Sequence, residues 1–192
     1  MYVRDAKNRD EVWLLDHIEA MGLDEEAFRS RDYVIAMDEA SNERVGFGRL
    51  RIHKGDPDVC ELTGIGVLSG WRGQGVGAHV VERLVMKARD EGFEPVYSLT
   101  DEASYLTQYG FEPIDDADLP DPLQDRLETK REAIDKDVIG LVLEGEFEMP
   151  ERARERFKTA VRTDSESDET EERPEDFGID PDSATYKYDT GR

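Results

Sequence analysis

The amino-acid sequence predicts a mixed α/β domain built on one sheet, with the element order β-α-α-β-β-β-α-β-α-β-β. Two observations indicate this class. Segments with apolar residues at every third or fourth position alternate with segments of period two, and one strand-like run leads directly into a glycine-rich turn and a helix. A chain of 192 residues holds one ordinary domain but not two comfortable cores. We therefore expect one domain over residues 1–162 and an acidic tail over residues 163–192.

The first half of the domain is expected to contain a strand, two helices and three further strands. The second helix is the shorter one, with Asp24 as its N-cap. In the longer strands apolar and polar residues alternate, as they do in a half-buried strand. The predicted ranges are 2–5 for the first strand, 10–21 and 24–30 for the helices, and 32–37, 45–53 and 59–67 for the strands that follow.

After the glycine-rich turn the pattern becomes helical. Apolar residues between Val80 and Ala88 lie on one face of the expected helix, and Gly92 ends it. The remaining predicted elements are a strand at 96–99, a helix at 103–109, a strand at 111–114, a polar connection with some helix at 115–136, a strand at 138–143 and a closing helix at 151–160. The tail has too few apolar residues to offset the entropy of ordering, so we expect it to be disordered; an arm that docks through its aromatic residues is the alternative.

The charge balance excludes several function classes. Asp and Glu number 47 against 25 Lys and Arg, which gives a formal net charge of −22. Nucleic acids and anionic membranes both attract a basic face, so neither is an expected partner. An acid-rich, lysine-poor chain indicates a cytoplasm of high salt, where charge repulsion is screened; an ordinary acidic protein is the alternative. Because no apolar segment approaches 18 residues and no signal peptide is evident, we expect a cytoplasmic enzyme without a membrane span.

The glycine-rich turn at residues 72–77, Arg-Gly-Gln-Gly-Val-Gly, is the strongest functional signal. A strand that opens into such a turn and a helix presents backbone N–H groups at a helix N-terminus, which suits a phosphate or diphosphate. A P-loop is excluded because the turn does not end in Gly-Lys-Ser/Thr. A nicotinamide-dinucleotide turn is disfavoured, because the preceding strand follows an antiparallel meander and does not open a parallel sheet.

Two motifs resemble the GNAT superfamily of N-acetyltransferases. Residues 67–77, V-L-S-G-W-R-G-Q-G-V-G, are similar to its motif A, Arg/Gln-x-x-Gly-x-Gly/Ala, with Arg72, Gly75 and Gly77 at the three defining positions. Residues 103–112, A-S-Y-L-T-Q-Y-G-F-E, resemble its aromatic helix followed by Gly-Phe-Glu. The resemblance implies the acyl-CoA N-acyltransferase fold from about residue 2 to residue 114, with a last strand at 138–143, and does not cover the tail.

By this resemblance the co-substrate is acetyl-CoA, and the backbone of the turn holds its diphosphate. The strand at 59–67 would bulge near residues 64–66 and splay from the strand at 96–99, which leaves backbone groups free for the pantetheine arm. Glycines that merely weaken a buried strand are the alternative. The Val67 N–H would be the oxyanion donor. The expected coenzyme-binding residues are Ile65, Gly66, Val67, Arg72, Gly73, Gln74, Gly75, Val76 and Gly77.

Acetyl transfer to an amine requires a base for the ammonium proton and an acid for the leaving thiolate. Glu61 lies six residues before Val67, where some members of the superfamily place a general base. On an apolar strand its pKa would be raised; a solvent-facing carboxylate is the alternative. The superfamily's acid tyrosine corresponds to Leu106, which departs from the pattern. Tyr105 takes that role if the helix is rotated, and otherwise packs as an ordinary aromatic side chain.

The sequence therefore predicts an N-acetyltransferase that transfers acetyl from acetyl-CoA to a primary amine by direct transfer. The acceptor is a small molecule or a protein amino group, and a homodimer is left open. No metal is expected, because three scattered histidines and one cysteine do not form a ligand set. Two alternatives remain: a non-catalytic acyl-CoA-binding module, and a functional acidic tail carried by a scaffold domain.

Overall fold

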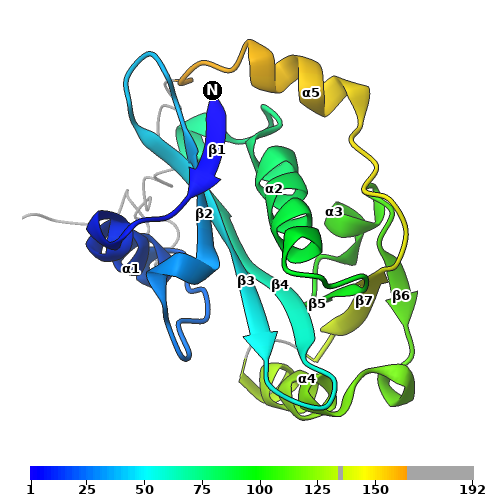
Figure 1. Ribbon diagram of the computed structural model, residues 1–192. Helices are drawn as coiled ribbons and strands as arrows, with labels where there is room; N and C mark the ends of the chain where they lie inside the picture. Colours follow the sequence, from blue (N-terminus) through cyan, green and yellow to red (C-terminus); the bar gives the residue numbers. More distant parts are fainter. Residues whose placement is uncertain (134–135, 164–192) are drawn as a thin grey trace, which may run out of the picture. The chain divides into compact units, whose positions relative to one another are not determined.

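A single sheet organises the fold in the computed structural model, which describes residues 1–133 and 136–163 (Figure 1). In these residues seven strands pair in the order β1-β2-β3-β4-β5-β7-β6. The strands are β1 (Tyr2–Asp5), β2 (Tyr33–Met37), β3 (Arg44–His53), β4 (Val59–Val67), β5 (Val96–Thr100), β6 (Glu112–Ile114) and β7 (Ile139–Leu143). Each lies within one residue of its predicted bounds. The predicted tail lies, apart from Thr163, outside the described residues, and Met1–Arg162 form one compact unit.

The pairing of the strands divides the sheet into two parts. Strands β1 to β4 form an antiparallel meander, as the sequence predicts. Strand β5 is parallel to β4, and β7 lies antiparallel between β5 and β6. Among the described residues, β4 and β5 pair only at Glu61 and Tyr97. Beyond that point the two strands diverge, so the predicted splay is confirmed.

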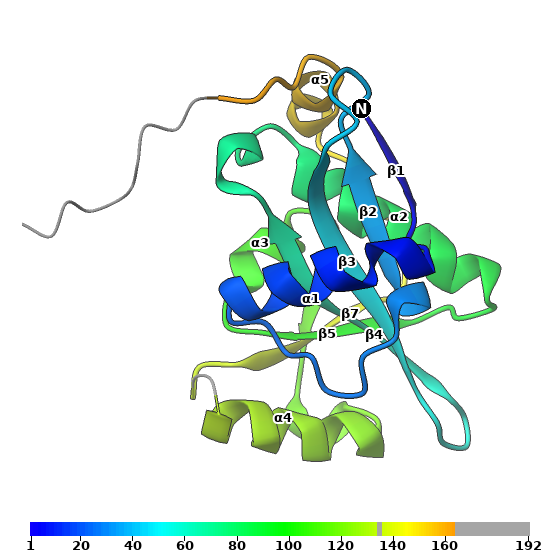
Figure 2. The ribbon, with the colours of Figure 1, turned by 90° about the vertical axis from the view of Figure 1, so that its left-hand side faces the viewer.

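Helices cover both faces of the sheet, as Figure 2 shows for α1 and α2. The helices are α1 (Glu11–Ala20), α2 (Val76–Asp90), α3 (Ala103–Thr107), α4 (Asp121–Ala133) and α5 (Glu151–Lys158). Helices α2 and α5 share one apolar cluster with Cys60 and Leu62 of β4. Helices α1 and α4 pack on the other face, where α4 meets Val59 of the same strand. Successive residues of β4 therefore face opposite layers. No helix in the described ranges has the length and apolar character that a membrane crossing requires.

The predicted helix at residues 24–30 is wrong. The segment consists of turns and ends in a short 3-10 helix, Ser30–Asp32. The Asp24 carboxylate accepts the N–H of Glu26, and Ala27 adopts a left-handed φ of 50°. The guanidinium of Arg49, which is buried in β3, donates to the carbonyls of Glu26 and Ala27 at 2.7 and 2.6 Å. These carbonyls bond a side chain from the sheet and do not continue a helical ladder.

Helix α4 occupies most of the segment that the sequence predicts as a polar connection. Its Leu123 and Leu127 lie one turn apart and join an apolar cluster with Val59. Arg126 and Lys130 are also buried on this helix. The helix therefore brings two cationic side chains under the sheet, beside the point where β4 and β5 diverge.

Candidate functional site

A cleft of about 920 Å³ opens where β4 and β5 diverge. Its walls come from β4, the glycine-rich turn, the start of α2, the end of β5, α3, α5 and the loop after α1. Of the nine predicted coenzyme-binding residues, eight line it: Ile65, Gly66, Val67, Arg72, Gly73, Gly75, Val76 and Gly77. The structure thus places this continuous strand and turn along one cleft, and the binding of a coenzyme by these residues stays a prediction.

Gln74, the ninth predicted residue, does not line the cleft, and its side chain bonds the segment after α5. Its Nε2 donates to the Val161 carbonyl at 2.8 Å, and its Oε1 accepts the Val161 N–H at 2.9 Å. The side chain thus fastens the segment after α5 to the turn. Its backbone N–H is the part that remains for a ligand.

The turn presents a row of backbone donors at the N-terminus of α2. Among the described residues, no backbone carbonyl accepts a hydrogen bond from the N–H groups of residues 73–78. The first bond of the helical ladder runs from His79 N–H to the Gly75 carbonyl at 3.2 Å. Gly73 and Gly75 adopt left-handed φ values of 69° and 78°, which turn the chain sharply into the helix. Free amides and the positive end of a helix dipole together favour a phosphate group.

Strand β4 is distorted just before this turn. Phe47 of β3 lies opposite Gly66, whereas Arg49, two residues further on, lies opposite Thr63. Three steps of β4 therefore match two of β3, and Gly64 has a left-handed φ of 59°. The predicted bulge is confirmed.

Beyond Glu61, the edge of β4 that faces the cleft pairs with no strand among the described residues. Leu68 N–H bonds the Val45 carbonyl on the β3 side, so the preceding N–H, that of Val67, points to the opposite edge. Val67 also turns its carbonyl to this edge, where it accepts a hydrogen bond from Arg72 Nε at 3.0 Å. The Val67 N–H therefore faces the place where β5 has separated from β4, as an oxyanion donor must.

Tyr105 lines the same cleft beside the start of α2. A Cβ built on Gly77 would overlap its hydroxyl oxygen, so the two groups are in close contact. Leu106 is 3% exposed and belongs to the core, and it lines the same cleft as Tyr105. The assignment of Tyr105 as the acid stays a prediction. Burial raises the pKa of Tyr105, and the neighbouring Tyr109 and Glu102 add to the effect, so the phenol stays protonated at neutral pH.

Glu61 is fully buried on the α4 side of the sheet and is not among the residues that line the cleft. Its Oε2 accepts hydrogen bonds from His53 Nε2 at 2.7 Å and Arg126 Nε at 2.6 Å. Burial alone raises the pKa of this carboxyl, but the His53 hydrogen bond and the charges of Lys130 and Arg126 outweigh it and lower the pKa. The expected raised pKa is wrong, and so is the solvent-facing alternative. The solvent-facing alternative failed because this face of the sheet is buried, and the raised pKa failed because His53 of β3 and the two cations of α4 stabilise the ionised carboxylate.

Lys130 is the functional candidate that the sequence did not reveal. Its Nζ donates to the Leu99 carbonyl on β5 at 3.0 Å and to Thr63 Oγ1 on β4 at 3.4 Å. It also lies 3.6 Å from Glu61 Oε1, an oxygen without a hydrogen-bond partner among the described residues. Burial lowers the pKa of Lys130, although the Glu61 charge opposes this. Lys130 thus bridges the diverging strands and lines the cleft.

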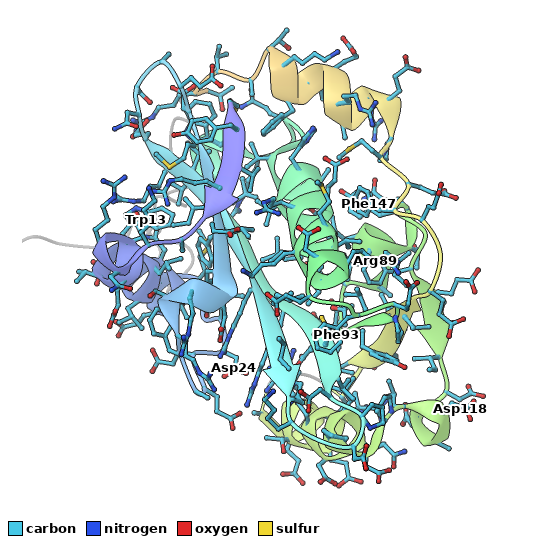
Figure 3. All side chains as sticks on the ribbon, in the orientation of Figure 1. Trp13, Asp24, Arg89, Phe93, Asp118 and Phe147 are labelled. Atoms are coloured by element: carbon cyan, nitrogen blue, oxygen red, sulfur yellow. The ribbon has the colours of Figure 1, made fainter. Side chains whose placement is uncertain are left out.

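Asp24 connects the loop after α1 to this buried cluster. Its carboxylate, labelled in Figure 3, accepts a hydrogen bond from Arg126 Nη2 at 2.7 Å, and the residue also lines the cleft. Arg126 therefore joins Asp24 to Glu61. Within the described ranges, no group of three or more His, Cys, Asp or Glu side chains is arranged to hold a metal ion.

Comparison with known proteins identifies relatives of this arrangement. The model of the acetyltransferase (GNAT) family matches residues 3–111. The fold is similar to N-acetylglutamate synthase from Neisseria gonorrhoeae complexed with coenzyme A and N-acetyl-glutamate (17% identity, TM-score 0.60). That match covers 77% of this chain but only 35% of the synthase, so the chain spans about a third of its length.

Two further solved structures match nearly their whole length. Rv2747 from Mycobacterium tuberculosis, in complex with CoA and NLQ, has a TM-score of 0.59 at 18% identity, with 74% of this chain and 98% of that chain covered. Naa50 of Arabidopsis thaliana, in complex with the bisubstrate analogue CoA-Ac-MVNAL, has a TM-score of 0.52 at 14% identity, with 73% and 96% covered. At such identities the likeness shows a shared fold.

Proposed function

Because the chain belongs to the GNAT acetyltransferase family, we propose that it transfers an acetyl group from acetyl-CoA directly to a primary amine. Membership of this family makes the chain an acyltransferase whose acyl donor is an acyl-CoA thioester. The acetyl group and the amine are the proposed part. One observation carries the proposal: the free amides of residues 73–78 and the open edge of β4 meet in one cleft.

The donor side of the cleft has groups for three parts of an acyl-CoA: the diphosphate, the pantetheine arm and the thioester. The amides of residues 73–78 suit the diphosphate, since they combine free N–H groups with a helix N-terminus. The open edge of β4 offers backbone donors and acceptors to the amides of a pantetheine arm, much as an added strand would use them. The Val67 N–H stabilises the negative charge that develops on the thioester oxygen during attack.

Tyr105 donates a hydrogen bond to the sulfur of the leaving thiolate, which is the contribution of the predicted acid. Its phenol is protonated at neutral pH, and its hydroxyl lies against Gly77 at the mouth of the cleft. A thiol is a stronger acid than a phenol of raised pKa, so full proton transfer from Tyr105 to the thiolate is uphill, and Tyr105 acts mainly by hydrogen-bonding the departing sulfur while the proton comes finally from solvent. The gain from this residue is therefore modest, and we expect the rate to fall without vanishing when it is lost.

Lys130 is better placed than Glu61 to receive the proton of the acceptor ammonium. It lines the cleft, and burial lowers its pKa toward that of an amine that can accept a proton. Glu61 lies behind it, with Oε1 at 3.6 Å from the Lys130 Nζ, and holds it in position. Glu61 thus retains a part in the base function as a positioning residue.

The proposal is tested by release of free thiol from acetyl-CoA in the presence of an amine panel. The panel contains α-amino acids, a peptide with a free N-terminus and a polyamine, since the similar structures carry an acetylated amino acid and an acetyl-peptide analogue. Mass spectrometry of the product identifies the acylated nitrogen. Propionyl-CoA in place of acetyl-CoA tests the acyl group.

Binding of acetyl-CoA without thiol release above background, for every amine, would reject the enzyme proposal in favour of an acyl-CoA-binding module. Val67→Pro is the informative variant, because it removes the oxyanion N–H at the strand edge. Val45→Ala is its matched control on the neighbouring strand, since it removes buried apolar atoms but no backbone donor of the cleft. We expect turnover to be lost in the first and kept in the second.

A further inference from the structure

We propose that helix α5 forms a cationic cover on the coenzyme turn, in which Arg152 and Arg156 bind phosphate groups of the coenzyme. The helix lies outside residues 3–111, which the family model matches. The inference rests on the proposed coenzyme site and adds two residues to it.

Helix α5 packs directly against the turn, and Figure 1 shows it running across the end of α2. A Cβ built on Gly75 would overlap the carbonyl oxygen of Ala153, so glycine permits this approach. The Phe157 ring stacks on the imidazole of His79, with centroids 3.7 Å apart and planes at 9°. Together with the paired hydrogen bonds between Gln74 and Val161, these contacts fasten both ends of α5 to the turn.

The docked helix turns two arginines toward the cleft. Arg152 and Arg156 lie four residues apart, on the same side of the helix, and both line the cleft. Arg156 Nη1 donates to the Gly73 carbonyl at 3.0 Å, which places the guanidinium at the row of free amides. A guanidinium has five N–H donors, so most of those of Arg156 remain for an anion.

The charges around these arginines point to a phosphate ligand. The chain has 47 acidic against 25 basic side chains, yet among the described residues neither Arg152 nor Arg156 forms an ion pair with a carboxylate. Arg72 is the first residue of the turn; among the described residues its guanidinium bonds the Val67 carbonyl and no carboxylate. A net charge of −22 repels an anionic coenzyme at long range, so local cations are needed to offset that repulsion. Three arginines without carboxylate partners around one row of amides meet this need.

The test measures affinity by calorimetry for the full chain and for R152Q, R156Q and R152Q/R156Q. The matched control is R154Q, an exposed arginine of the same helix that does not line the cleft. We expect each cleft arginine to contribute about tenfold in Kd for coenzyme A, and R154Q to stay within about twofold. Since Arg152 makes no bond to the turn, R152Q tests the charge without undocking the helix.

Two further ligands identify the phosphate. Dephospho-CoA lacks the 3′-phosphate. If the arginine variants still lose affinity for it, the arginines contact the diphosphate; if they bind it as the unmodified chain does, the arginines contact the 3′-phosphate. With a pantetheine thioester, which has no phosphate, all variants should bind equally. If R152Q/R156Q binds coenzyme A as R154Q does, the inference is overturned. If the unmodified chain does not bind coenzyme A, the proposed function itself fails, so the two failures are distinguishable.

Discussion

Replacing Gly77 with alanine should displace the Tyr105 hydroxyl, so that a change in the coenzyme turn alters the position of the proposed acid. The motif tolerates alanine at this position, but in this chain the hydroxyl of Tyr105 occupies the space that a Cβ needs. The Tyr105 ring is also held from its other side by Tyr109, whose ring stands perpendicular to it at 5.4 Å. Gly77→Ala therefore forces Tyr105 out of its position.

The size of the effect follows from two contacts. The hydroxyl oxygen must move by roughly 1 Å to reach an ordinary separation, and overpacking of this kind costs about 1–3 kcal/mol. Because Tyr105 is half-buried and faces an open cleft, we expect the lower end of that range. Once the hydroxyl is removed, the nearest ring carbon lies 3.2 Å from the new Cβ, which needs only a small adjustment. Gly77→Ala should therefore cost little in a Tyr105→Phe background.

The assay is a double-mutant cycle with two readouts. Urea denaturation of the four proteins gives the free energies of unfolding, and thiol release gives kcat. We expect a coupling of about 1 kcal/mol in stability. For kcat, the double variant should be no slower than Tyr105→Phe alone, since there is no hydroxyl left to displace. Additive losses in both quantities would refute the close contact between Gly77 and Tyr105.

Three further predictions concern buried charge, the single thiol and salt. Glu61→Gln should destabilise the fold by about 3 kcal/mol, because it removes the buried negative charge that pairs with Arg126 Nε and Lys130 Nζ, while Arg126 keeps its ion pair with Asp24. Since folding lowers the pKa of Glu61, its contribution to the free energy of unfolding is present above the unfolded pKa near 4.3 and is lost as the pH falls through the folded pKa. In chemical denaturation, the stability of the variant should therefore vary less with pH below about 4 than that of the unmodified chain. The same loss of stability at acid pH in both proteins would contradict the ion pair. Burial raises the pKa of Cys60 to about 12, so a thiol reagent at neutral pH should label it only at the rate of unfolding, and rapid labelling of the native protein would contradict its burial. A net charge of −22 should make Tm rise with molar KCl, and a salt-independent Tm would remove the high-salt interpretation.

Local signals explain why the strands and the coenzyme turn were predictable. The alternation in β3 and the glycines of β4 and of the turn each act within a few residues of where they stand. Left-handed φ values at Gly64, Gly73 and Gly75 are conformations that glycine adopts without strain, so the bulge and the turn are encoded directly.

The errors arise where distant residues decide the local structure. Residues 24–30 have a helical pattern and an N-cap, yet Arg49, more than twenty residues further along the chain, takes their carbonyl groups. Glu61 looked like an isolated carboxylate because its partner Arg126 lies 65 residues away. A pattern read over a short window contains neither contact, since both depend on how the helices pack on the sheet.

These long-range contacts also explain why the sequence predicts the acyl-CoA side of the cleft better than the proposed amine side. The donor side consists of backbone amides and glycines in one continuous segment, so its chemistry can be derived from sequence order. On the proposed acceptor side, the guanidinium of Arg126 joins the loop at Asp24, the helix α4 and β4. In the sequence, Asp24 looks like a helix N-cap and the cations of α4 look like part of a polar connection, so neither indicates a buried cluster with Glu61. Because Arg126 is shared, the shape of the acceptor side and the stability of the sheet depend on the same ion pairs, and selection for a new acceptor must preserve both.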